Sequence, residues 1–202
     1  MAEATVFVVD DDEAVRDSLA AVLEVHGFAI ETYHSAESFW DGWSRDRRGV
    51  LLLDVRMSGM SGLQLHQRLV AEKVRLPVIM MTGHGDVPMA VQAMKLGALD
   101  FLEKPIDVDL LVERVRSALE EAEIATLEQM AAAEAERRLG ALTEREREVL
   151  ALLVSGQPNK VIAHELGIST RTVEVHRARV MEKTQVQSFS ELIRLAIAAN
   201  CS

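Results

Sequence analysis

Four short segments rich in apolar residues each run directly into side chains that could carry out phosphoryl or metal chemistry. The segments and the groups after them are 6–9 with Asp10, Asp11 and Asp12, 50–53 with Asp54, 78–81 with Thr82, and 98–103 with Lys104 and Pro105. Parallel α/β sheets bind ligands where the carboxyl ends of their strands converge. If these segments are parallel strands, their carboxylates, hydroxyl and ammonium meet in one place. We expect such a site to hold Mg²⁺ and a phosphoryl group on a carboxylate.

Asp54 is the carboxylate best placed to act as a nucleophile. Mg²⁺ prefers six oxygen ligands and keeps several waters, so one or two further carboxylates suffice to hold it. A carboxylate oxygen of Asp54 could then attack phosphorus, while Lys104 and the Thr82 hydroxyl neutralise or bond the phosphoryl oxygens. Each of these residues alone is an ordinary turn residue. Their complementary chemistry at four separate strand ends is what indicates a site.

Strand-like and helix-like segments alternate over residues 1–120. Strands are predicted at 5–9, 28–32, 50–54, 77–81 and 98–102, and helices at 13–26, 35–45, 61–72, 87–96 and from 107 onward. Nearly continuous apolar strands are typical of parallel sheets covered on both faces, and this alternation implies right-handed βαβ units. The predicted fold class is α/β, with a five-stranded, doubly wound parallel sheet in the flavodoxin-like strand order 2-1-3-4-5.

Residues 107–139 contain neither Gly nor Pro and become rich in Ala and Glu, which are strong helix formers. The last helix of the sheet domain could therefore continue as a linker until Gly140, a good helix stop. Leu119, Ile124, Leu127 and Met130 form only a narrow apolar stripe. Two interpretations stay open: a solvated helical linker, or a short coiled-coil contact.

A second, all-helical pattern begins after Gly140. Thr143 and Glu146 form a capping box at the start of one helix. Further helices are predicted at 160–166, from Ser169 or Thr170 to about Lys183, and at 190–199, with the tight turn 167–169 between the second and third. Two helices joined by a short Gly-containing turn indicate a helix-turn-helix module. We expect three parts: a domain at 1–120, a helical linker at 121–139 and a helix-turn-helix domain at 140–202.

The net charge of −10 comes from the first part of the chain, because the second part is slightly positive. Residues 1–140 carry 14 basic against 25 acidic side chains, whereas residues 141–202 carry 8 against 7. The acidic total therefore does not argue against nucleic-acid binding by the second part. No segment reaches the roughly 18 apolar residues that a membrane span needs, and the N-terminus does not read as a signal peptide. Cys201 is the only cysteine, and we expect a reducing, cytoplasmic setting with no membrane partner.

Residues 5–120 resemble the receiver domain of bacterial two-component response regulators. The resemblance lies in Val8–Glu13, Leu53–Gly62, Met81–Gly85 and Phe101–Pro105, which match the signatures of that family in order and spacing. It implies that Asp54 is the phosphoacceptor and that Asp10 and Asp11 form the acidic pair. Asp11, Asp54 and the backbone carbonyl of Arg56 would bind Mg²⁺ directly, with Asp10 acting indirectly.

The same resemblance assigns a switch. Thr82 and Phe101 would be the switch hydroxyl and aromatic ring, Lys104 would contact the phosphoryl group, and Lys104-Pro105 would be a cis peptide. Ser58 is a visible departure, because the family usually has Pro there. This departure bears on the geometry of the loop and on the lifetime of the phosphoryl group.

Residues 142–177 resemble a LuxR-type helix-turn-helix domain. The matching segments are Leu142–Leu150, Asn159–Ala163, Leu166–Ser169 and Thr172–Arg177. Receiver plus this module is the NarL/FixJ class of response regulator, and Met81–Pro88 with Thr172–Ala178 is most similar to the FixJ branch. Family analogy places Glu174, Val175 and Ala178 toward the groove. The same analogy places Lys160, Thr172, Arg177 and Arg179 at phosphates. Helical spacing alone assigns Arg171, Glu174, Val175, Ala178 and Arg179 to the outward face of the third helix.

The expected function is a DNA-binding regulator that is not an enzyme. Its partners would be a sensor histidine kinase, double-stranded DNA, a second copy after phosphorylation of Asp54, and RNA polymerase. Two alternatives are weighed: a Mg²⁺-dependent aspartyl-phosphate phosphohydrolase, and a receiver that acts only as a protein-binding switch. Phosphohydrolases of that kind place the nucleophile after the first strand, whereas Asp54 ends the third. From residue pattern alone, the third helix of the second domain could also be a charged, solvated helix.

Overall fold

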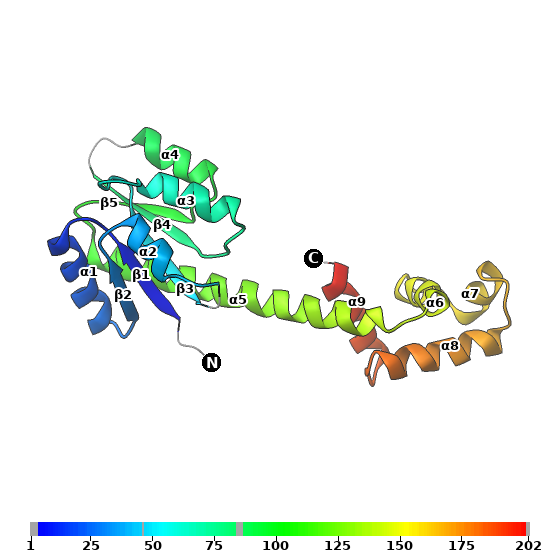
Figure 1. Cartoon of the computed structure of the whole chain (residues 1–202). Helices are drawn as coiled ribbons and strands as arrows, with labels where there is room; N and C mark the ends of the chain where they lie inside the picture. The colour runs from blue at the N-terminus through cyan, green and yellow to red at the C-terminus, as the bar shows by residue number, and fades with distance from the viewer. Residues whose placement is uncertain (1–3, 46, 84–86, 201–202) are drawn as a thin grey trace. The chain divides into compact units, whose positions relative to one another are not determined.

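The computed structural model describes residues 4–45, 47–83 and 87–200. The chain divides into two compact units, Met1–Ile124 and Ala125–Ser202. The elements of each unit are labelled in Figure 1. Among the described residues, no helix is both long enough and apolar enough to cross a membrane.

The first unit contains a five-stranded parallel sheet of order β2-β1-β3-β4-β5, which confirms the predicted fold class and strand order. Its strands are β1 (Thr5–Val9), β2 (Ala29–Tyr33), β3 (Gly49–Asp54), β4 (Val78–Thr82) and β5 (Asp100–Glu103). Its helices are α1 (Glu13–Val25), α2 (Ala36–Gly42), α3 (Gly62–Ala71), α4 (Val87–Lys95) and the first part of α5 (Val108–Gly140), whose residues from Ala125 onward belong to the second unit. Because all the strands are parallel, their carboxyl ends lie at the same edge of the sheet.

Alternate residues of the central strands pack into two separate cores. Phe7, Leu51 and Leu53 face one core, which α2, α3 and α4 cover. Val8 and Leu52 face the other, which α1 and the first part of α5 cover. This follows from the two-residue period of a strand. Because both faces are covered, β1 and β3 are buried along nearly their whole length, as the continuous apolar runs predicted.

Helix α5 extends over 33 residues to Gly140, in line with the absence of Gly and Pro from its interior. Its middle carries Ile124, Leu127 and Met130 with side chains more than half exposed. The narrow apolar stripe predicted for the linker is thus present on a continuous helix.

The second unit contains four further helices: α6 (Glu144–Val154), α7 (Asn159–Glu165), α8 (Thr170–Lys183) and α9 (Phe189–Asn200). Thr143 caps α6 in a capping box with Glu146, as predicted. Of the two caps considered for α8, Ser169 is the one that accepts the backbone N–H of Thr172. One apolar cluster joins α6, α7 and α8, and a second joins α6, α8 and α9.

Candidate functional site

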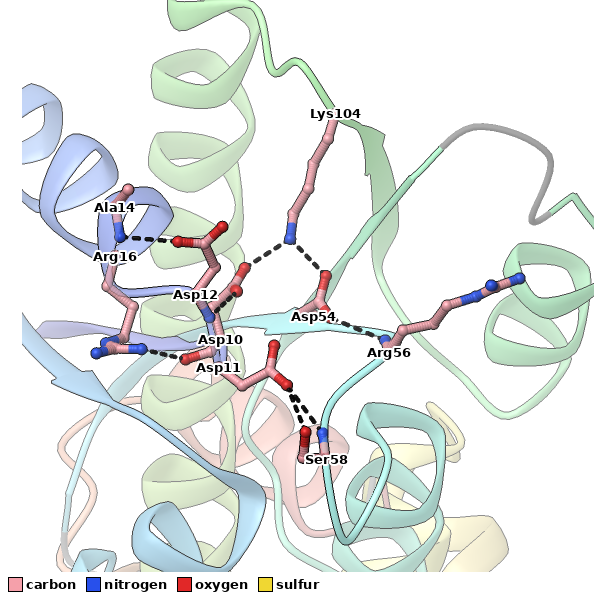
Figure 2. A network of polar contacts seen from close by, with 9 residues as sticks. All are labelled: Asp10, Asp11, Asp12, Ala14, Arg16, Asp54, Arg56, Ser58 and Lys104. Carbon is pink, nitrogen blue, oxygen red and sulfur yellow. Dashed lines mark hydrogen bonds and ion pairs between the residues drawn. The ribbon is translucent and has the colours of Figure 1, made fainter.

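The acidic residues predicted to form a site lie together at the carboxyl edge of the sheet (Figure 2). Asp10 follows β1 directly, and Asp54 is the last residue of β3. Carboxylate oxygens of Asp10, Asp11 and Asp54 all lie within 4.8 Å of one another. The sequence places these residues up to 44 positions apart, and parallel pairing of β1 with β3 brings them together.

Lys104 joins two of these carboxylates. Its Nζ lies 2.6 Å from Oδ2 of Asp10 and 2.5 Å from Oδ1 of Asp54. Asp10 and Asp54 are buried, whereas about a quarter of the Lys104 side chain is exposed. One ammonium therefore balances two buried carboxylates, which leaves the cluster with an excess of negative charge.

Burial and this ammonium act on the site in opposite directions. Burial raises the pKa of Asp54 above its usual value, and the bond from Lys104 only partly offsets the effect. Burial alone would lower the pKa of Lys104, but the bonds to Asp10 and Asp54 raise it overall. Lys104 is therefore held in its charged form beside the carboxylate that it contacts.

Asp11 lies at the surface of the cluster and is held from a different element. Its Oδ2 accepts the backbone N–H of Ser58 at 2.9 Å and the Ser58 hydroxyl at 3.1 Å. The backbone bond is the largest cause that lowers the pKa of Asp11. This carboxylate thus stays ionised and tethered to the loop after β3.

The other residues that the resemblance singled out lie on β4, on β5 and in the loops that follow β3 and β5. Thr82 ends β4 and is buried, and its hydroxyl donates to the carbonyl of Gly83 at 3.3 Å. Phe101 lies on β5 with 45% of its surface exposed. The Lys104-Pro105 peptide bond is cis, as the family resemblance implied. Arg56 follows Asp54 in the loop and donates its backbone N–H to Oδ2 of that residue at 2.8 Å. Residues 84–86 of the motif at 81–88 lie outside the described residues.

The cluster suits a hard divalent cation. Its donors are carboxylate oxygens from the loop after β1 and from the end of β3, and its excess negative charge would be neutralised by such an ion. Receiver domains in general bind Mg²⁺ at an acidic pocket of this kind.

Helix α8 separates its predicted faces as expected. Val173 and Val180 are buried against the other helices of the unit. The exposed residues of α8 include all five that were assigned to its outward face, namely Arg171, Glu174, Val175, Ala178 and Arg179. Lys160 on α7 is exposed as well, and Thr172 is half-buried.

Arg177 differs from these residues because it also packs within the unit. Its guanidinium carbon lies 5.3 Å from the centre of the Phe189 ring on α9, and the side chain is half-buried. A cation over an aromatic face is an attractive contact. Arg177 therefore has a structural contact besides any role in binding DNA.

Two further interactions outside the acidic cluster were not anticipated from the sequence. Buried Glu146 accepts the Lys183 ammonium at 2.7 Å, which ties the start of α6 to the end of α8. Glu37 on α2 accepts the backbone N–H of Met60 at 2.9 Å and so ties the loop after β3 to α2. The capping box identified Glu146 only as a local cap, and nothing in the sequence marked Glu37.

Comparisons with known proteins agree with both halves of the structure. Residues 6–116 match the response regulator receiver domain, and residues 140–196 match the luxR family of bacterial regulatory proteins. The chain is 48% identical to the transcriptional regulatory protein FixJ of Rhizobium meliloti, over 98% of this chain and 97% of that protein. It is 50% identical to FixJ of Azorhizobium caulinodans, over 96% and 92% respectively.

Solved structures give the same result. The response regulator StyR superposes with a TM-score of 0.83 at 40% identity, covering 96% of this chain and 98% of that one. Full-length FixJ from B. japonicum superposes with a TM-score of 0.62 at 44% identity, with both chains fully covered.

Fold, acidic site and helical module together define a DNA-binding transcriptional regulator with a receiver domain. The chain belongs to the two-component response regulator family and is FixJ-like, with a receiver domain followed by a LuxR-type DNA-binding domain. The phosphohydrolase alternative is not favoured, because the helical module matches a family of DNA-binding regulators.

Proposed function

We propose that Asp54 is the phosphoacceptor of a switch that controls DNA binding. The observation that carries this proposal is the bond between Lys104 and Asp54 at the edge where Asp10 and Asp11 also lie. A carboxylate oxygen of Asp54 attacks the phosphorus of a phosphohistidine on a sensor kinase. The new P–O bond forms as the P–N bond to the kinase histidine breaks.

The other residues of the site support this transfer. Asp11, Asp54 and the backbone carbonyl of Arg56 would hold Mg²⁺, with Asp10 acting through a neighbouring ligand. When bound, the cation would supply positive charge beside the phosphoryl oxygens. Lys104 binds one of these oxygens and Thr82 donates its hydroxyl to another. Lys104 already contacts the Asp54 carboxylate, so its ammonium needs only a small movement to reach a phosphoryl oxygen on that residue.

The switch would act through Phe101. Thr82 moves toward the phosphoryl group, and Phe101, which is 45% exposed in the structure, turns into the space that Thr82 leaves. The surface formed by α4, β5 and α5 then favours a two-fold dimer. Phosphorylation thus raises the fraction of molecules whose α4-β5-α5 surface has the conformation that dimerises.

The second unit would provide the output. Glu174, Val175 and Ala178 face the major groove. The residues that would contact phosphates around them are Lys160, Arg171, Thr172, Arg177 and Arg179.

We assign the receiver to 1–120, the linker to 121–139 and the DNA-binding domain to 140–202. The module has nearly balanced charge, so two copies on two half-sites would bind more strongly than one. The DNA-bound protein would also contact RNA polymerase. Its location would be the cytoplasm, where the chromosome is accessible.

Incubation of the full chain with acetyl phosphate and MgCl₂ tests the phosphoacceptor. We expect intact mass spectrometry to show one added phosphoryl group, which Asp54→Asn abolishes. Asp12→Asn is the matched control, because Asp12 caps α1 through the N–H of Ala14 and Asn can cap a helix equally well. Continuous release of phosphate without a stable adduct would instead indicate a phosphohydrolase.

A further inference from the structure

Alternate backbone N–H groups of the loop after β3 each donate to a different carboxylate. The N–H of Arg56 donates to Asp54 at 2.8 Å, that of Ser58 to Asp11 at 2.9 Å, and that of Met60 to Glu37 at 2.9 Å. The middle bond is the one that reaches across to the loop after β1. A side chain of the loop reinforces this bond, because the Ser58 hydroxyl also donates to Asp11.

These bonds determine how Asp11 presents its oxygens. Both Ser58 donors bind Oδ2, and Figure 2 shows the other oxygen of Asp11 turned away from Ser58. Asp11 is exposed, so packing does not restrict the rotation of its carboxylate. The two hydrogen bonds are what fixes the group and leaves one oxygen available to the acidic cluster.

We propose that Ser58 is a positioning residue for the divalent cation, because it orients Asp11 as a ligand through a single oxygen. Groups that hydrogen-bond a metal ligand fix its orientation and raise metal affinity. This chain therefore uses a hydroxyl and an N–H where an imino acid would offer neither donor. The inference rests on the proposed function, since it concerns the cation of the phosphoacceptor site.

The Ser58 hydroxyl could also weaken cation binding, if it competed with the cation for the same oxygen of Asp11. If the cation needed Oδ2, it would have to displace Ser58, and the hydroxyl would compete with the metal. Removal of the hydroxyl would then strengthen metal binding. Positioning predicts weaker binding, so the direction of the change distinguishes the two.

Calorimetric titration of MgCl₂ into the full chain measures this direction. We expect Ser58→Ala to raise the dissociation constant for Mg²⁺ about tenfold, the low end of the range for such outer partners, because the N–H bond remains. Ser58→Thr keeps both donors and should stay within about twofold of the wild type on the same grounds. Unchanged or tighter binding by Ser58→Ala would overturn the proposal.

Glu37→Ala is the matched control for loop rigidity. It removes the neighbouring bond to Met60 and leaves Asp11 and Ser58 intact. We expect Mg²⁺ affinity close to wild type in this variant. A loss equal to that of Ser58→Ala would show that loop stiffness, and not the orientation of Asp11, sets the affinity.

The Ser58 amide resonance gives a second readout that does not depend on phosphoryl transfer. Positioning requires that this N–H stay hydrogen-bonded when Mg²⁺ saturates the site, so its proton shift should remain downfield and its exchange slow. A shift to the position of a free amide would overturn the proposal. If wild-type protein failed to bind Mg²⁺ at all, the proposed function would fail, whereas equal affinities of wild type and Ser58→Ala would refute only the role of Ser58.

Discussion

At the scale of single residues, burial and the neighbouring Lys104 ammonium act in opposite directions on the pKa of Asp54. Two buried carboxylates share one ammonium, and a third carboxylate lies beside them. Like charges at this distance raise the free energy of the ionised state. Lys104 therefore favours the ionised form of Asp54, and a bound cation would neutralise the remaining negative charge.

Replacement of Lys104 by Ala should raise the pKa of Asp54 further. Burial already raises this pKa, whereas the hydrogen bond and the charge of Lys104 both lower it. The substitution removes these two lowering effects. The measurement is an NMR titration of the Asp54 carboxyl carbon without metal, in wild type and variant. Because Asp54 lies beside other carboxylates, the comparison uses its apparent pKa.

Lys95→Ala, which removes a lysine at the end of α4, serves as the control. An equal pKa of Asp54 in wild type and Lys104→Ala would show that the ammonium does not stabilise the ionised carboxylate.

The sequence was sufficient to predict which residues form this cluster but not how they bond. Four strand ends with complementary groups predicted that Asp10, Asp11 and Asp54 converge, because parallel pairing alone brings them together. The choice of Lys104 to bridge Asp10 and Asp54, and of Asp11 to accept Ser58, depends on side-chain conformations. No spacing in the chain encodes those.

At the scale of elements, the sequence predicted the order and type of the helices and strands well and their ends less well. Strand 98–102 was expected, but β5 begins at Asp100. The N–H of Ala98 returns to the carbonyl of Ala93, and Gly97 adopts a φ of 91°, so this stretch closes the end of α4 before the strand starts. Similarly, α2 ends at Gly42 because Trp43 is already extended.

The contact between α6 and α8 makes a second prediction at this scale. Lys183→Met leaves the buried carboxylate of Glu146 without its ammonium partner. We expect the free energy of unfolding of the second unit to fall by about 1–2 kcal/mol. This is at or below the low end of the values for charged hydrogen bonds, because Lys183 is partly exposed to solvent. Native-state hydrogen exchange of the Val180 and Leu192 amides measures the loss, because both residues belong to the adjoining core.

The same pair defines a pH dependence. The bond from Lys183, together with the hydrogen bonds of Thr143, lowers the pKa of Glu146 from 4.5 to about 2. A folded pKa below the unfolded one gives stability that is present above about pH 4.5 and is lost as the pH falls toward about 2. The difference between wild type and Lys183→Met should therefore shrink over that interval. Lys160→Met removes an exposed lysine from α7 and should show no such difference; an equal loss in both variants would contradict the argument.

At the scale of the whole molecule, binding to DNA should depend on salt through the exposed cations of α8. Arg179→Ala should reduce the salt slope of DNA binding by about 0.9 for each lost phosphate contact. Arg179 suits this test better than Arg177, because Arg177 also packs on Phe189. The measurement is fluorescence anisotropy with double-stranded DNA over a range of salt concentrations.

Arg137→Ala is the control for simple loss of charge. Arg137 is exposed on α5 and pairs with Glu134, so its removal should leave the slope unchanged. If both variants lowered the slope equally, a general effect of net charge would explain the result, and the assignment of Arg179 to a phosphate contact would be wrong.

Dimerisation upon phosphorylation should depend on the exposed apolar residues of α4 and β5. Val91, Met94 and Phe101 are each more than 40% exposed in the unphosphorylated chain. A two-fold interface uses the same patch on both copies, so one substitution acts twice. Val91→Glu should therefore weaken association of the phosphorylated chain at least about tenfold, since charge facing like charge disfavours an interface, and should leave the yield of the Asp54 adduct unchanged.

Sedimentation velocity with and without acetyl phosphate and MgCl₂ measures this association. Val25→Glu is the matched control, because Val25 on α1 is 85% exposed and α1 covers the sheet face opposite to α4. We expect the wild type and Val25→Glu to double in mass upon phosphorylation and Val91→Glu to stay monomeric. The same mass for wild type in both states would remove dimerisation from the mechanism. A monomeric Val25→Glu would place the interface on α1 instead, because the adduct yield shows separately that the switch residue has been modified.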